Sequence, residues 1–64
     1  MAIRKGKKVR YIGTRNELMI GKTYEVHSKD HNLIEISAPV KYIDGSIHFS
    51  RCHMDISDFE LVAD

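Results

Sequence analysis

Apolar and polar residues alternate on both sides of the dipeptide Asp44-Gly45. Asp-Gly between two alternating runs indicates a β-hairpin, because a type I′ turn needs a positive φ at both central residues. We therefore expect a hairpin with a two-residue loop, in which Ile43 faces Ser46. This register gives the hairpin one apolar face, made of Val40, Tyr42, Ile47 and Phe49. Its other face is polar and carries Lys41, His48, Ser50 and Cys52.

The same period of two predicts strands over residues 8–13, 22–28, 33–43, 46–53 and 59–62. A long loop over residues 13–21 and a polar turn over residues 29–32 join the first three strands. Residues 55–59 have the pattern of a single 3₁₀ turn. Pro39 falls on the outward phase of the third strand, where its missing N–H predicts an edge position or a bulge.

Five short strands, a long first loop, a tight hairpin and a 3₁₀ turn before the last strand predict an all-β fold, a five-stranded SH3-like small barrel. An OB-fold usually has a helix between strands three and four, and a two-residue connection leaves no room for one. The inward positions predict one core. Its members are Val9, Tyr11, Leu18, Ile20, Tyr24, Val26, Ile34, Ile36, Val40, Tyr42, Ile47, Phe49, Ile56, Phe59 and Leu61.

The length of 64 residues indicates one domain, which we place at residues 8–64 behind a flexible basic segment at residues 1–7. A chain of this size has little room for a deep catalytic cleft, so we expect no enzyme. Cys52 is the single cysteine, which excludes an intramolecular disulfide. No apolar run approaches the about 20 residues of a membrane-spanning helix. We expect a soluble cytoplasmic protein that makes no contact with a membrane.

Two segments carry a family resemblance. Residues 8–13 read Lys-Val-Arg-Tyr-Ile-Gly, and residues 21–26 read Gly-Lys-Thr-Tyr-Glu-Val. This pair resembles the V-K-Y-I-G…G-K-x-Y-E-V opening of small SH3-like proteins encoded by bacteriophages and bacterial genomes. Residues 59–62, Phe-Glu-Leu-Val, are similar to the last strand of that group. The resemblance implies an SH3-like fold, a phage origin and a role as a binding module, and it transfers no catalytic residue.

Charge is distributed unevenly along the chain, although the net charge is +1. Residues 1–29 hold eight cations and two carboxylates, and residues 30–64 hold two cations and seven carboxylates. Such asymmetry points to a polar partner. The alternative is that the two halves neutralise each other across one small barrel. The candidate binding residues are Arg4, Lys5, Lys7, Lys8, Arg10, Arg15 and Lys22.

Candidate chemistry is sparse. His48 and Cys52 lie four residues apart on a strand, about 13 Å, which is too far to bind one ion. A structural zinc site needs four ligands, usually in close pairs, so we expect neither a metal nor another cofactor. Cys52 as a nucleophile would need a neighbouring base, and His53 points to the opposite face.

Two functional hypotheses follow. The first is a non-enzymatic, phage-encoded module that docks on a host or phage protein, acting as a monomer or a weak homodimer in the host bacterial cytoplasm. The second is a nucleic-acid-binding barrel, because residues 6–10 (Gly-Lys-Lys-Val-Arg) show a faint likeness to KOW-type barrels of ribosomal and transcription factors. A basic segment that is merely solvated is the third reading of the same residues.

Overall fold

The computed structural model describes residues 2–62, which form strands, loops and one 3₁₀ turn. Met1, Ala63 and Asp64 belong to the predicted segments 1–7 and 8–64 and lie outside the described residues. The elements are β1 (Lys8–Tyr11), β2 (Thr23–Glu25), β3 (Ser28–Asp30), β4 (Leu33–Lys41), β5 (Ile47–Asp55), η1 (Ile56–Asp58) and β6 (Phe59–Leu61). The all-β class and the 3₁₀ turn before the last strand are therefore confirmed.

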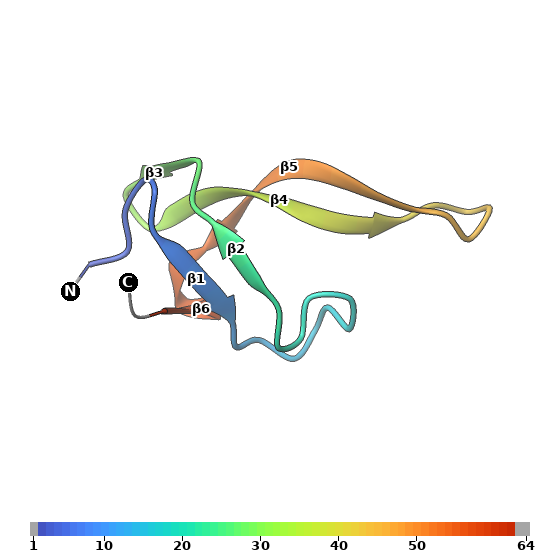
Figure 1. Ribbon diagram of the computed structural model, residues 1–64, viewed down its shortest axis with the longest axis horizontal. Coiled ribbons are helices and arrows are strands. Elements are labelled where there is room, and N and C mark those ends of the chain that lie inside the picture. Colours follow the sequence, from blue (N-terminus) through green and yellow to red (C-terminus); the bar gives the residue numbers. More distant parts are fainter. Residues whose placement is uncertain (1, 63–64) are drawn as a thin grey trace.

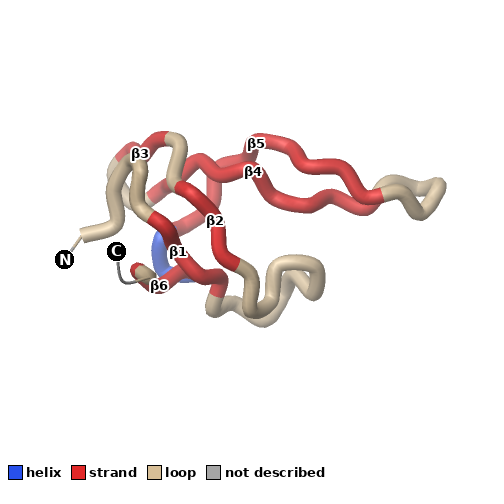
Figure 2. Tube along the Cα trace, in the orientation of Figure 1, coloured by secondary structure: helices blue, strands red, loops and turns tan. Residues whose placement is uncertain are grey.

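Within residues 2–62 the strands form two antiparallel sheets of three strands each (Figures 1 and 2). The strand orders are β2-β1-β6 and β3-β4-β5, and the two sheets are not closed into a barrel. Six strands replace the predicted five because the segment predicted as one strand over residues 22–28 divides. Residues 23–25 form β2, which pairs with β1, and residues 28–30 form β3, which pairs with β4. The polar turn predicted over residues 29–32 is therefore wrong at residues 29–30, and the turn is limited to His31 and Asn32.

The division falls at Val26 and His27. The Val26 N–H donates to the Lys7 carbonyl, and the His27 N–H donates to the Glu35 carbonyl. Successive N–H groups of an extended chain point to opposite sides. Val26 therefore bonds to the segment before β1, and His27 bonds to β4. The His27 ring also lies 2.9 Å from the Ser37 hydroxyl, which holds the chain against β4. One continuous segment thus joins the two sheets.

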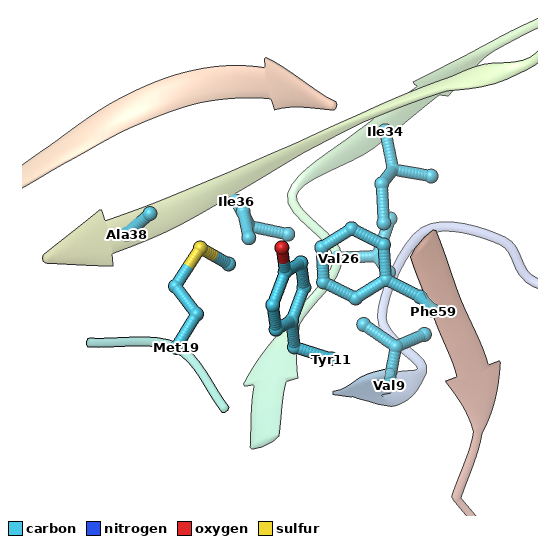
Figure 3. Close-up of a cluster of buried hydrophobic side chains, with 8 residues drawn as sticks. All are labelled: Val9, Tyr11, Met19, Val26, Ile34, Ile36, Ala38 and Phe59. Carbon is cyan, nitrogen blue, oxygen red and sulfur yellow. The ribbon is translucent and has the colours of Figure 1, made fainter. Parts of the chain in front are cut away.

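The core lies between the two sheets (Figure 3). Its buried members are Val9, Tyr11, Met19, Val26, Ile34, Ile36, Ala38 and Phe59. The Tyr11 and Phe59 rings meet edge to face, with their centroids 5.6 Å apart, a geometry that aromatic pairs favour. Six of the predicted core residues are therefore confirmed. Tyr24 and Ile56 are partly buried and pack against this cluster.

The loop between β1 and β2 contributes Met19 to the core, whereas Leu18 and Ile20 were predicted. Leu18 is half-buried and Ile20 is 51% exposed, so the prediction for these two residues is wrong. The reason is local turn geometry. The Asn16 side chain accepts the Leu18 N–H, and the Asn16 carbonyl accepts the Met19 N–H. This turn directs Met19 toward Ala38 on β4, as Figure 3 shows.

The β4–β5 hairpin has a different register from the predicted one. Tyr42 lies opposite Ser46, because the Tyr42 N–H donates to the Ser46 carbonyl and the Gly45 N–H donates to the Tyr42 carbonyl. The loop therefore has three residues, and Gly45 takes the left-handed conformation with φ of 89°. This is the type I turn with a following glycine bulge. Asp44 keeps a negative φ, since His31 is the one non-glycine residue with positive φ among residues 2–62.

A change of one residue in the register changes the faces of the hairpin. Val40 lies opposite His48, Pro39 opposite Phe49, and Lys41 opposite Ile47. The predicted apolar face is therefore wrong, because its members divide between the two sides. All four residues were also predicted as core, and all four are exposed: Val40 40%, Tyr42 48%, Ile47 51% and Phe49 70%.

Pro39 lies on an unpaired stretch of the β4 edge, as its missing N–H predicts. β3 covers β4 only from Leu33 to Glu35, so beyond Glu35 the outer edge of β4 has no hydrogen-bonded neighbour within the described residues. The N–H groups that donate to β5 belong to even-numbered residues, as at Tyr42. Proline at position 39 therefore removes no rung of the ladder, and it leaves the outer edge without a donor there.

Candidate functional site

The seven predicted binding cations come from three parts of the chain. Arg4, Lys5 and Lys7 belong to the turn that precedes β1, and Lys8 and Arg10 lie on β1. Arg15 and Lys22 belong to the loop between β1 and β2. Figure 1 shows the start of the chain at one end of the molecule and the β4–β5 hairpin at the other. Residues 4–8 therefore hold the densest group of these cations along the chain.

The N-terminal turn is attached to the body of the protein. The Lys7 N–H donates to the Arg4 carbonyl, and Gly6 takes φ of 87°, as the third residue of a type II turn requires. The Gly6 N–H donates to the Val26 carbonyl, and the Val26 N–H returns a bond to Lys7. The flexibility expected for residues 1–7 is a statement about motion and stays a prediction.

Carboxylates flank the cations of β1. Arg10 forms an ion pair of 2.8 Å with Glu60 on β6, and Lys8 lies opposite Glu25 on β2. The Arg10 and Glu60 side chains are 46% and 50% exposed, so this pair adds little to stability, about 0–1 kcal/mol. On this face of the sheet the two carboxylates balance the charges of Lys8 and Arg10. The Arg10–Glu60 pair joins a cation of residues 1–29 to a carboxylate of residues 30–64. It supports the alternative that the charges of the two halves of the chain neutralise each other.

The sequence did not identify the most unusual surface of the molecule. Among the described residues, eight large apolar side chains are exposed, and five of them lie on one segment. These five are Val40, Tyr42, Ile43, Ile47 and Phe49. We call the segment from Val40 to Phe49 the hairpin arm. Figure 1 shows the ends of β4 and β5 and the loop between them extending beyond the rest of the molecule along its long axis. A concentrated apolar surface of this kind indicates a contact with another molecule.

A groove of about 570 Å³ lies beside the hairpin arm. The loop before β2 forms one wall, with Glu17, Leu18 and Lys22, and β2 adds Thr23 and Tyr24. The opposite wall consists of Pro39, Ile47 and Phe49. The groove is thus apolar along the hairpin and carries one carboxylate and one ammonium group on the loop side. Burial raises the pKa of the Tyr24 phenol, and the nearby Cys52 raises it further.

The tip of the hairpin arm is held by a short polar network. The Asp44 carboxylate accepts the Ser46 N–H at 2.9 Å and the Ser46 hydroxyl at 2.6 Å. Nε2 of His48 lies 2.9 Å from the same hydroxyl oxygen. The His48 ring also lies against Tyr42, with ring centroids 4.2 Å apart. The bonds from Ser46 lower the pKa of Asp44 below its usual value. These contacts fix the loop that presents Ile43, which is fully exposed.

The residues considered for chemistry, His48, Cys52 and His53, all lie on β5. Burial raises the pKa of the Cys52 thiol, which disfavours the nucleophilic thiolate. Cys52 packs against the core and lies opposite Ile36, whereas His53 lies opposite Glu35 on the other face of the sheet. Within residues 2–62 no three histidine, cysteine or acidic side chains lie close enough together to hold a metal ion.

The described part of the chain contains no helix with the length and apolar character needed to cross a bilayer. Comparison of the chain with protein-family models, curated proteins and solved structures finds no match. The case for a function therefore depends on the geometry of the hairpin arm, the groove and the cations.

Proposed function

We propose that the protein is a small, non-enzymatic binding module that docks on another protein through the hairpin arm. The observation that carries this proposal is the concentration of exposed apolar side chains there, up to 70% exposure for Phe49 and full exposure for Ile43. An isolated two-stranded hairpin is marginally stable in water, and exposed apolar residues on it become favourable only when a partner covers them.

We further propose that the fold is a variant of the SH3-like barrel and that the protein is phage-encoded and cytoplasmic. Support for the fold comes from the order of its parts. One strand segment serves both sheets, a long loop follows β1, a tight hairpin joins β4 to β5, and a 3₁₀ turn precedes β6. Support for the origin is the resemblance of residues 8–13 and 21–26 to small phage and bacterial proteins.

The test is affinity capture from a bacterial lysate with three immobilised proteins. They are the wild type, Ile47→Ser and Ile12→Ser. Ile47 and Ile12 are both 51% exposed, so the two variants remove equal apolar surface, one from the hairpin arm and one from outside it. We expect a stoichiometric protein with the wild type and with Ile12→Ser, and its loss with Ile47→Ser. Equal recovery on all three, or no recovery on any, would count against docking through this arm.

The second candidate function is nucleic-acid binding, and the cations at residues 4–8 favour it. Four of these five residues are Lys or Arg, and they lie at the end of the molecule remote from the hairpin arm. Binding to phosphates weakens steeply with salt, and removal of one phosphate-binding cation lowers the log–log slope by about 0.7–0.9. A mobility-shift titration with Lys5→Gln and Lys8→Gln tests this. The absence of any shift at low salt would remove this candidate.

A further inference from the structure

We infer that the groove beside the hairpin arm accepts the hairpin tip of a second copy of this chain. This inference rests on the proposed function, since a second copy uses the same surface and competes with another protein for it. In the dimer that follows, each copy contributes one tip and one groove. The interface is then isologous, the arrangement most common among soluble dimers.

Shape and apolar character match between the tip and the groove. The tip presents Ile43, whose side chain is fully exposed, and the loop of three residues holds it at the extreme of the hairpin. The groove offers an apolar lining from Leu18, Tyr24 and Phe49. A side chain of this size that enters such a lining gains about 1.5–3 kcal/mol from burial. The position of Ile43 therefore suits it to be the central contact.

Charge complementarity favours a second copy over an unrelated partner. The loop wall of the groove carries Glu17 and Lys22, one of each sign. The tip carries Lys41 and Asp44 on either side of Ile43, again one of each sign. Insertion of the tip can therefore place Lys41 of the second copy near Glu17, and Asp44 of the second copy near Lys22. The net charge of +1 adds almost no repulsion between two copies.

The outer edge of β4 gives a second reason why side-chain docking is favoured. Pro39 leaves that edge without a donor, so a partner strand cannot extend the sheet there in a regular ladder. The edge of β5 has no hydrogen-bonded neighbour among the described strands, and pairing of β5 with β5 of a second copy is the competing arrangement. That arrangement does not involve Glu17, which makes the two distinguishable.

Sedimentation velocity over a range of protein concentrations tests the inference. We expect a reversible dimer for the wild type and for Ile12→Ser, and a dissociation constant raised about tenfold or more by Ile43→Ser. A type I turn accepts serine at this position, and circular dichroism checks that each variant is folded. A wild type that stays monomeric up to millimolar concentration would overturn the inference.

A charge exchange tests the geometry. Glu17→Lys and Lys41→Glu should each weaken the dimer, and the double variant should recover much of the loss, because the pair is restored with its signs reversed. A dimer dissociation constant unchanged by Glu17→Lys and by Lys41→Glu would overturn tip-in-groove docking in favour of β5 pairing. Failure here leaves the proposed function intact, since a monomer with a free arm can still capture a foreign protein. The proposed function fails separately if Ile47→Ser changes no capture.

Discussion

Phe49 lies directly opposite Pro39 across the β4–β5 hairpin, and both side chains line the same wall of the groove. The pair places an aromatic ring that is 70% exposed beside a proline that blocks the strand edge. Phe49 therefore belongs to the binding surface, whereas Pro39 beside it is buried.

Phe49→Ala should have little effect on stability, because most of the ring is already in water. We expect a loss of less than about 1 kcal/mol in the free energy of unfolding, against about 2–5 kcal/mol for Ile36→Ala, whose side chain is fully buried. Urea unfolding of the two variants under dilute conditions measures both. A loss for Phe49→Ala as large as that for Ile36→Ala would show that the hairpin has the other register.

Gly13→Ala should be destabilising for a steric reason. A Cβ at position 13 would lie 2.5 Å from the Tyr11 hydroxyl oxygen and 2.6 Å from the ring carbon that bears it. Tyr11 is 4% exposed and packs against Phe59, so its ring has little freedom to move away. We expect a loss of about 1–3 kcal/mol. Thr14→Ala, at an exposed neighbouring position, is the control and should be nearly neutral in the same thermal unfolding experiment.

The alternation of residues predicted much of this fold. It identified β1 with Val9 and Tyr11 inward, β4 with Ile34 and Ile36 inward, and the 3₁₀ turn. The hairpin register could not be decided, because Asp-Gly suits both a two-residue loop and a three-residue loop that ends in a left-handed glycine. The three-residue loop is identified only by the hydrogen bonds that Ser46 makes with Tyr42 and Asp44 in the structure.

The candidate site was less predictable than the fold. Which apolar residues are exposed depends on the register, so four of the five exposed apolar residues of the hairpin arm were predicted as core. Met19 lies in a loop with no period that would mark it as inward. The neutralisation of Arg10 depends on Glu60, a residue 50 positions away that becomes a neighbour only through the pairing of β1 with β6.

Stability should fall as the pH falls below about 4, partly through Asp44 and Asp55. Hydrogen bonds from Ser46 and Ser57 lower the folded-state pKa of these carboxyls below the usual value of 3.8. A lowered folded-state pKa means that the stabilisation is complete above the unfolded-state pKa and is lost as the pH falls through the folded-state value. The melting temperature measured from pH 7 to pH 2 should show this decline. Asp44→Asn and Asp55→Asn should each flatten it, and a wild-type slope unchanged in both variants would contradict the assignment.

Cys52 should react slowly with thiol reagents in the folded protein. Burial raises the pKa of the thiol, so the reactive thiolate is scarcer at neutral pH than in an unfolded chain. Alkylation rates with and without denaturant, measured at pH 7 and at higher pH, check this. A faster reaction in the folded state would indicate an activated thiol and would reopen the question of catalysis.

The most direct test of the hairpin arm as the contact surface is the concentration dependence of backbone amide chemical shifts in the ¹⁵N-labelled protein. On concentration, the shifts should change at residues 17–24 and 39–49, which include the groove and the hairpin arm, and should stay constant at residues 4–10. Changes confined to residues 4–10, or no changes at any concentration, would contradict self-association through the hairpin arm.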